Sequence, residues 1–288
     1  MTMTLHELYK KACRMLEEAG VPDTDYDAFR LIQFITGIDR SDLIAEGERQ
    51  IDDRQAEKCL RLLEKRASRI PLQHLIGETE FMGLSFTVNP DVLIPRPDTE
   101  ILVETATEKA AGIQTGKILD IGCGSGCILI SLLHDLNFGL DEPLWKGVGS
   151  DISPAALKTA RINGQRNHQE ALITWVQSDL FNEIPEETYS FIVSNPPYIP
   201  SDVIESLEPE VRDYDPLSAL DGGVDGLSFY RKMIPQARRY LEPGGWLIVE
   251  IGYDQKVPVK ELFTRYGFCG IECRQDLAGL DRVIAGHM

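Results

Sequence analysis

The feature that most constrains the fold is a regular alternation of short apolar runs and amphipathic segments from Lys117 to the end of the chain. The apolar runs predict strands over residues 118–121, 147–151, 173–179, 191–194, 245–251, 269–275 and 282–286. The segments between them predict helices over residues 127–136, 153–163, 226–241 and 257–266, the third kinked or interrupted at Pro235. Strands and helices that alternate in this way form a doubly wound α/β sheet with right-handed crossovers. Such sheets bind their ligands at the carboxyl ends of the strands.

The residues before this region follow two other patterns. Apolar residues at helical spacing predict helices over residues 5–20, 23–38 and 53–68. Strand-like residues predict a β-hairpin over 81–88 and 92–94, with turns at Gly83 and Asn89. We therefore predict a helical domain over residues 1–75, a β-hairpin linker over 76–95 and the α/β domain over 96–288. The helical domain shows no catalytic residue pattern, so we expect it to pack on the rest of the chain or to present a partner to it.

A glycine-rich turn follows the first predicted strand. Gly122, Gly124 and Gly126 form a G-x-G-x-G run that also contains Cys123 and Ser125. The dinucleotide-binding fingerprint needs a further glycine where this chain has Cys127. The departure favours a smaller nucleoside ligand that approaches the backbone closely.

Acidic residues follow the next two predicted strands. Asp151 stands where an acid commonly binds a ribose diol. Asp179, next to Leu180, can accept a hydrogen bond from an adenine amino group. Either acid alone can instead cap a helix, but the order glycine turn, acid, acid along successive strand ends favours a nucleoside site.

The fourth predicted strand leads into Asn195-Pro-Pro-Tyr198. The Asn195 amide oxygen and the Pro196 carbonyl can each accept a hydrogen bond from one –NH2 group, and Tyr198 can stack on a planar group between them. Asn-Pro and Pro-Pro are also common turn sequences, so the tetrapeptide alone fits a turn or a site equally well.

A long segment over residues 199–227 follows, and its length suggests a lid or a substrate-binding element. Arg212 and Asp215 in this segment are candidates to orient a substrate, or they form surface salt bridges. Earlier in the chain, the prolines of residues 94–100 preset the backbone, and Asp98 is expected to cap a helix that begins near Thr99. The alternative for residues 94–100 is a rigid linker.

Charge and cysteine content narrow the class of protein. A net charge of −17 disfavours a protein whose main task is to grip a nucleic acid backbone. The six cysteines lack zinc-site spacing, so we expect free thiols and no metal. Without a signal sequence or a long apolar run, the sequence indicates a cytoplasmic protein that does not associate with a membrane.

From about Pro95 onward, the glycine turn, the two acids and Asn195–Tyr198 resemble the class I S-adenosylmethionine-dependent methyltransferases. The tetrapeptide is similar to the motif of those that methylate adenine N6, cytosine N4 or glutamine N5. The resemblance implies a mostly parallel doubly wound sheet with an antiparallel last strand. It also implies S-adenosyl-L-methionine as methyl donor and S-adenosyl-L-homocysteine as product.

Three further stretches, residues 71–81, 93–100 and 211–226, resemble the bacterial PrmC/HemK family, which methylates glutamine N5 in peptide chain release factors. The resemblance runs nearly end to end, including a helical N-terminal domain for substrate recognition. Two positions depart from the family pattern: Asp215 stands where glutamate is frequent, and Leu180 where an aromatic residue is frequent. These departures leave the role of Asp215 open and replace an aromatic contact to adenine with an aliphatic one.

The resemblance implies roles for the site residues. Asn195, Pro196 and Tyr198 would be catalytic, with no dedicated general base and no catalytic histidine. Cofactor binding would use the residues of the glycine turn, the strand-end acids and their neighbours, namely Gly122, Cys123, Gly124, Ser125, Gly126, Asp151, Asp179, Leu180 and Asn195. Substrate binding would use Asn195, Pro196, Pro197, Tyr198, Arg96 and Arg212.

The expected function is therefore methyl transfer to the glutamine of the Gly-Gly-Gln motif of release factors, by a monomer with no direct need for nucleic acid. The alternatives are methylation of a ribosomal-protein glutamine, methylation of adenine N6 in nucleic acid, and a non-catalytic module that binds S-adenosylmethionine.

Overall fold

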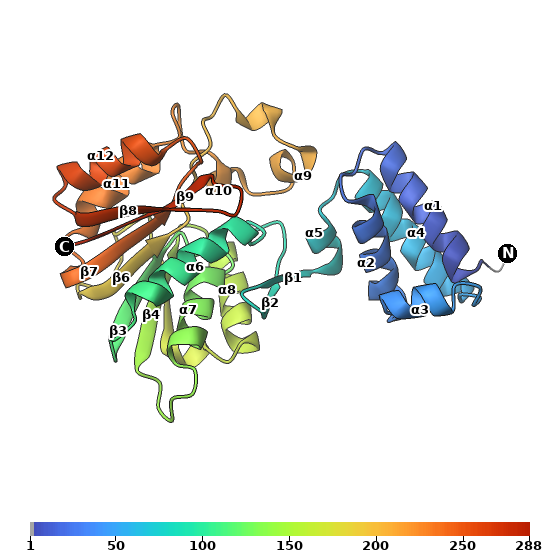
Figure 1. Ribbon diagram of the computed structural model, residues 1–288, viewed down its shortest axis with the longest axis horizontal. Helices are drawn as coiled ribbons and strands as arrows, with labels where there is room; N and C mark the ends of the chain where they lie inside the picture. The colour runs from blue at the N-terminus through green and yellow to red at the C-terminus, as the bar shows by residue number, and fades with distance from the viewer. Residues whose placement is uncertain (1–2) are drawn as a thin grey trace. The chain divides into compact units, whose positions relative to one another are not determined.

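The computed structural model describes residues 3–288, and these fall into two compact units (Figure 1). The first comprises the residues up to Gly77 together with Glu208–Tyr214. The second comprises Glu78–Leu207 and Asp215–Met288. The polypeptide therefore passes from one unit to the other three times. The division adds the segment Glu208–Tyr214 to the helical part of the chain, whereas the domain boundaries predicted above at residues 75 and 95 stay a prediction.

The first unit is helical. Its helices are α1 (Leu5–Glu18), α2 (Thr24–Thr36), α3 (Arg40–Ala45), α4 (Asp53–Ala67), α5 (Leu72–Ile76) and the short α9 (Pro209–Arg212). α1 begins with a capping box between Thr4 and Glu7, and Asp52 caps α4. The apolar faces of α1, α2 and α4 form one core around Leu8, Leu31 and Leu63.

A buried ion cluster fixes Glu208–Tyr214 within this unit. Arg66 of α4 donates to Asp27 at 2.6 Å and lies 2.9 Å from Glu210. Arg69 donates to Glu210 at 2.5 Å and to Glu208 at 2.8 Å. Each charge at the centre of this cluster therefore has a partner of opposite sign, as burial requires.

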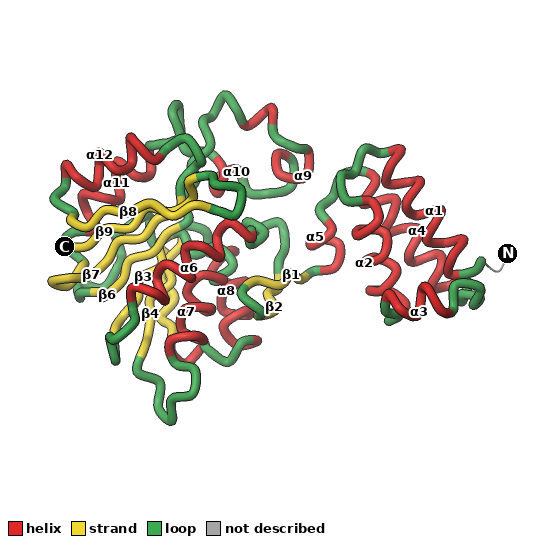
Figure 2. The backbone as a smooth tube through the Cα atoms, viewed as in Figure 1, coloured by secondary structure: helices red, strands yellow, loops and turns green. Residues whose placement is uncertain are grey.

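The second unit is a seven-stranded sheet of order β5-β4-β3-β6-β7-β9-β8 (Figure 2). Its strands are β3 (Gly116–Ile121), β4 (Trp145–Asp151), β5 (Ile173–Gln177), β6 (Tyr189–Ser194), β7 (Leu241–Glu250), β8 (Cys269–Gln275) and β9 (Asp281–His287). Its helices are α6 (Pro97–Lys109), α7 (Cys127–Leu136), α8 (Pro154–Arg166), α10 (Leu217–Leu220), α11 (Ser228–Ala237) and α12 (Lys256–Arg265), with short 3₁₀ turns at Glu170–Leu172 and Ile204–Ser206. β9 runs antiparallel to β7 and β8, and all other neighbours are parallel. The mostly parallel sheet with an antiparallel last strand is confirmed.

Helices cover both faces of the sheet, which explains why its strands are apolar on both sides. Ile118 faces a core formed with α6 and α7, whereas the next residue, Leu119, faces a core formed with α11 and α12. The strand order reverses between β3 and β6. The carboxyl ends of these two strands therefore border the crevice in which doubly wound sheets bind ligands.

The structure corrects four local predictions. The hairpin consists of β1 (Glu78–Phe81) and β2 (Leu84–Thr87), and residues 92–94 form no strand because Pro90 and Pro95 leave them without a ladder partner. The third strand ends at Gln177, two residues before Asp179. The fifth begins at Leu241, so the helix before it ends at Ala237.

The fourth correction concerns the start of α6. Asp98 does not cap this helix, because Pro97 already occupies the first turn and Arg96 the N-cap position. The Asp98 carboxylate instead pairs with Arg282 of β9 at 3.0 Å.

Candidate active site

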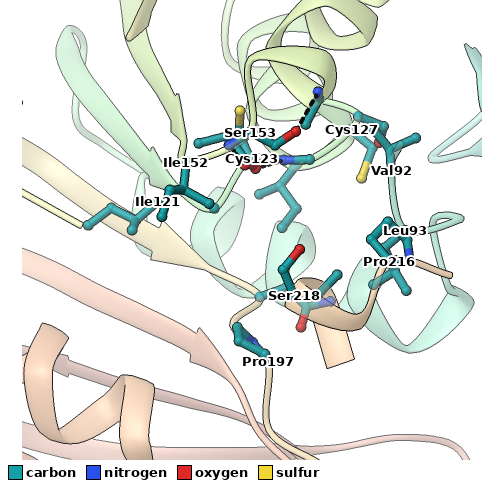
Figure 3. A pocket seen from close by; sticks show the side chains of 18 of the residues that line it. Val92, Leu93, Ile121, Cys123, Cys127, Ile152, Ser153, Pro197, Pro216 and Ser218 are labelled. Carbon is teal, nitrogen blue, oxygen red and sulfur yellow. Dashed lines mark hydrogen bonds between the residues drawn. The ribbon is translucent and has the colours of Figure 1, made fainter. Parts of the chain in front are cut away.

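A cavity of about 280 Å³ lies at the carboxyl ends of β3, β4, β5 and β6 (Figure 3). Ten of the predicted site residues line it: Arg96, Gly122, Cys123, Gly124, Ser125, Asp151, Asp179, Leu180, Asn195 and Pro197. In Figure 3, Pro197 and Ser218 lie across the cavity from Cys123 and Ser153. Residues from four strand ends thus meet in one place, as the order of the motifs predicts.

The three glycines of the turn after β3 differ in what they face. All three have positive φ values, between 54° and 80°. A Cβ on Gly122 or Gly124 would meet no atom within 4 Å, whereas one on Gly126 would meet Trp175 at 3.0 Å and Ile130 at 3.1 Å. The first two therefore leave the backbone open to the cavity, and Gly126 instead starts α7 against the interior.

Asp151 supports the glycine turn and keeps acceptor capacity for a ligand. One of its carboxylate oxygens accepts from the Gly124 N–H at 2.9 Å and the other from the Ser153 N–H at 2.9 Å. Burial raises the pKa of Asp151, and these two hydrogen bonds oppose the shift. Each oxygen retains a lone pair, which fits a ribose diol.

The turn after β5 holds Leu180 with a φ of 54°. The Ser178 hydroxyl donates to the Leu180 carbonyl at 2.9 Å and accepts from the Glu183 N–H at 3.0 Å. A branched residue in this backbone region is strained, and such strain concentrates at functional sites. The turn places both Asp179 and Leu180 on the cavity wall.

Only part of the Asn195–Tyr198 motif reaches the cavity. Asn195 and Pro197 line it, whereas Pro196 is buried and Tyr198 does not line it. The Asn195 Nδ2 donates to the Thr99 Oγ1 at 3.1 Å. The Tyr198 hydroxyl donates to the Glu250 carboxylate at 3.4 Å, so the side chain of Tyr198 is held at its hydroxyl end by Glu250.

Arg96 lines the cavity, and its guanidinium donates to Asp215 at 2.5 Å. The Asp215 side chain is fully buried, which excludes the surface salt bridge considered for it. Burial raises its pKa and the Arg96 charge opposes that shift, so the pair orients Arg96 at the cavity. Arg212 lies in the helical unit, where it donates to Asp213 at 2.7 Å.

Several lining residues were missed at the sequence level. Thr99, Pro216, Ser218 and Ala219 fall inside two of the family-like stretches, but their side chains suggested no chemistry. Phe229 lies in α11 and gave no signal. Two buried acids that do not line the cavity, Asp120 and Glu250, were predicted only as strand residues.

The cavity suits a positively charged nucleoside ligand. Its charged lining residues are three carboxylates, of Asp91, Asp151 and Asp179, and the single cation of Arg96. This excess of negative charge favours a sulfonium, and the open glycine backbone with a diol acceptor fits its nucleoside part.

Within residues 3–288, no cluster of three His, Cys, Asp or Glu side chains can hold a metal ion. In the same range no helix is long and apolar enough to cross a membrane.

The shifted pKa values of two buried carboxyls predict how the free energy of unfolding varies with pH. Burial raises the pKa of Asp120 to about 8 and that of Glu250 to about 7. Each folded-state carboxyl therefore holds its proton more tightly than in the unfolded chain, so its contribution to stability is present at low pH and lost as pH rises toward the folded pKa. We expect the free energy of unfolding to fall between pH 5.5 and 8.5, by on the order of 2 kcal/mol for Glu250 alone.

Urea unfolding followed by tryptophan fluorescence measures this dependence. All three tryptophans, Trp145, Trp175 and Trp246, lie in the second unit, so the signal reports on that unit alone. The variant Glu250→Gln should show a smaller loss between the two pH values than the unchanged protein. Equal stability of the unchanged protein at both pH values would contradict the prediction.

The chain matches two protein families and many individual relatives. Residues 7–77 match the PrmC N-terminal domain, and residues 97–206 match the methyltransferase small domain. The release factor glutamine methyltransferase of Geobacter sulfurreducens is 42% identical over 273 residues, which cover 95% of this chain and 93% of the relative. The protein of the same name from Caulobacter vibrioides is 37% identical over 286 residues, which cover 99% of this chain and 97% of the relative.

Solved structures also resemble the chain. The hMettl16 catalytic domain in complex with the MAT2A 3'UTR hairpin 6 has a TM-score of 0.58 and 18% identity, and the match covers 92% of each chain. At this level of identity the likeness shows the fold alone.

Proposed function

The chain belongs to the release factor glutamine methyltransferase family, and we propose that it transfers a methyl group from S-adenosyl-L-methionine to the N5 amide of the glutamine in the Gly-Gly-Gln motif of peptide chain release factors. The observation that carries the proposal is the convergence of the glycine turn, Asp151, Asp179 and Asn195 on one cavity. The cofactor supplies an activated methyl group on a sulfonium and leaves as S-adenosyl-L-homocysteine.

The geometry above supports a cofactor pocket at this end of the sheet. The backbone of Gly122–Gly126 would lie along the nucleoside, with Gly122 and Gly124 open to it and Gly126 turning the chain into α7. Asp151 would accept from the ribose hydroxyls. Asp179 would accept from the adenine amino group, and Leu180 would pack against the ring in place of an aromatic residue. The proposal includes no metal.

The acceptor site uses the Asn195–Tyr198 motif. A glutamine amide nitrogen is a poor nucleophile because its lone pair is delocalised into the carbonyl. The Asn195 oxygen and the Pro196 carbonyl accept its two hydrogens, orient it and stabilise the positive charge that develops on it. Pro197 and Tyr198 hold the planar amide, and Arg96 binds the surrounding substrate.

Asp151 supplies a prediction on cofactor affinity. In Asp151→Asn, the –NH2 group replaces an oxygen that accepts an N–H of Gly124 or Ser153, and the charge that favours the ribose hydroxyls is lost. We expect the Kd for S-adenosyl-L-methionine to rise roughly 10- to 100-fold, since hydrogen bonds to charged groups are worth about 1.5–3 kcal/mol. Calorimetric titration measures it, and an unchanged Kd would remove Asp151 from the cofactor site.

The partner, assembly and location form part of the proposal. The helical unit recognises the release factor, and the enzyme acts as a cytoplasmic monomer without a direct need for nucleic acid. The net charge of −17 supports the last point, because phosphate backbones are bound by basic surfaces.

Transfer of labelled methyl from S-adenosyl-L-methionine to a purified bacterial release factor tests the function. A factor with Gln→Ala in its Gly-Gly-Gln loop is the control. Label on the unchanged factor only is the expected result. With cofactor binding confirmed, absence of label on both would overturn the substrate and direct the search to ribosomal proteins and nucleic acid.

A further inference from the structure

Two asparagines of α8 line the edge of the hairpin strand β2 that faces away from β1 (Figure 1). The Asn163 Oδ1 accepts from the Thr87 N–H at 2.7 Å, and its Nδ2 donates to the Thr87 carbonyl at 3.0 Å. Asn167, at the end of α8, donates to the Ser85 carbonyl at 3.1 Å. Residues four apart on a helix are separated by about 6 Å, and residues two apart on a strand by about 6.7 Å. The two side chains therefore match the repeat of the strand and take the place of a third strand beside it.

The Asn163 amide also reaches the glycine turn of the candidate active site. Its Nδ2 donates a second hydrogen bond, to the Ser125 carbonyl at 2.9 Å. Ser125 stands between Gly124 and Gly126 and lines the cavity. Asn163 is fully buried, so this bond satisfies the Ser125 carbonyl inside the protein. One amide thus joins the hairpin to the glycine turn.

The other anchor of the turn lies on β4. Asp151 accepts from the Gly124 N–H at 2.9 Å. The peptide group that joins Gly124 to Ser125 lies between this bond and the one from Asn163. Glycine gives the backbone wide freedom, and the turn has a glycine at every second position, so its own sequence sets no single conformation. Hydrogen bonds from neighbouring elements must therefore fix the form in which the turn borders the cavity.

We propose that Asn163 is a positioning residue, which acts through the Ser125 carbonyl to hold the glycine turn in the form that receives S-adenosyl-L-methionine. The inference rests on the proposed function and deepens it, because it names a residue that does not line the cavity but sets the cofactor affinity. Without the Asn163 amide, the Ser125 carbonyl turns toward water in the free protein. Cofactor binding must then reverse this change, so the affinity falls by the worth of about one hydrogen bond.

The test compares Asn163→Leu with Asn167→Leu. Leucine has nearly the shape of asparagine but neither donates nor accepts, and both changes remove a hydrogen bond to the edge of β2. Only Asn163→Leu also removes the bond to the turn. It should raise the Kd for S-adenosyl-L-methionine roughly 5- to 10-fold, whereas Asn167→Leu should match the unchanged protein within about twofold. Calorimetric titration without a release factor gives the values, and equal Kd values for the two variants would overturn the proposal.

The kinetics supply a second readout. Once the cofactor is bound, the turn has regained its form, so kcat at saturating cofactor should fall less than about threefold in Asn163→Leu, while the KM for the cofactor rises with the Kd. A loss of kcat with an unchanged KM would be the mark of a general defect in the fold and would overturn the role of Asn163. If a leucine variant fails to fold, Asn163→Ala and Asn167→Ala repeat the comparison with smaller side chains.

A spectroscopic readout tests the contact itself. The Gly126 nitrogen belongs to the same peptide group as the Ser125 carbonyl, so its ¹⁵N amide signal responds to the hydrogen bond at that carbonyl. In the protein without cofactor, this signal should move in Asn163→Leu and keep its position in Asn167→Leu. A signal that moves equally in both variants, or in neither, would show that Asn163 does not hold the turn.

These measurements separate the inference from the proposed function. If the Kd values and the Gly126 signal behave as expected while no release factor is methylated, the proposed acceptor fails and the role of Asn163 stands. If a release factor is methylated but the two variants bind the cofactor equally, only the role of Asn163 fails.

Discussion

Asn195→Ala is expected to lower kcat for methylation of a release factor by about 10²- to 10³-fold, the effect typical of removing one preorganised polar group that stabilises developing charge. The amide of Asn195 lies on the cavity wall and is anchored through its nitrogen by Thr99, so its oxygen is the group that the alanine variant removes. The cofactor Kd should change less than about threefold, because the glycine turn and Asp151 remain. Single-turnover methyl transfer and calorimetric titration give the two values.

Asn195→Asp serves as the comparison variant. Its carboxylate still accepts from the substrate amide but cannot donate to Thr99, so its kcat should fall between those of the alanine variant and the unchanged protein. A fully active Asn195→Ala would show that the glutamine is held elsewhere. A large rise in cofactor Kd for both variants would instead assign Asn195 to the cofactor.

The order of motifs along the chain predicted where the cavity lies. The glycine turn, Asp151 and Asn195 each follow a run of buried apolar residues, and parallel strands bring their carboxyl ends to one edge of the sheet. Asp179 reaches the same cavity although β5 ends two residues earlier, since the turn at Leu180 folds back toward it. Local sequence pattern and sheet topology together therefore determine most of the cofactor side of the site.

What the sequence did not reveal depends on contacts between distant residues. Asn195 and Thr99, which are hydrogen-bonded, are 96 positions apart in the numbering, and Thr99 belongs to no recognisable catalytic pattern. Residues 199–227 were predicted as one lid or substrate-binding segment, yet Glu208–Tyr214 belongs to the helical unit because Arg66 and Arg69 bind its two glutamates. Periodicity reports burial within one element and carries no information on such pairings.

The backbone of Tyr198 is held by a close-packed pair of loops. Gln255 donates from its Nε2 to the Tyr198 carbonyl at 2.9 Å, and its Oε1 accepts from the Gly252 N–H at 3.0 Å. Gly226, with a φ of 71°, packs directly on the same carbonyl. A Cβ at this position would overlap the Tyr198 oxygen and the Gln255 amide, so no other residue type fits without moving the motif.

Gly226→Ala is therefore expected to destabilise the second unit by about 2–5 kcal/mol, from a left-handed backbone cost of about 1–2 kcal/mol and an overpacking cost of about 1–3 kcal/mol. Gly244→Ala is the matched control: its φ is 81° and a Cβ there meets nothing within 4 Å, so only the backbone cost of about 1–2 kcal/mol applies. In the fraction that stays folded, Gly226→Ala should also lower kcat about 100-fold by displacing Tyr198 and with it Asn195, whereas Gly244→Ala should leave kcat unchanged. Urea unfolding by tryptophan fluorescence and methyl transfer at a temperature where both variants are folded measure the two effects. Equal losses of stability and equal kcat values in the two variants would show that the contact with Tyr198 constrains neither the fold nor the site.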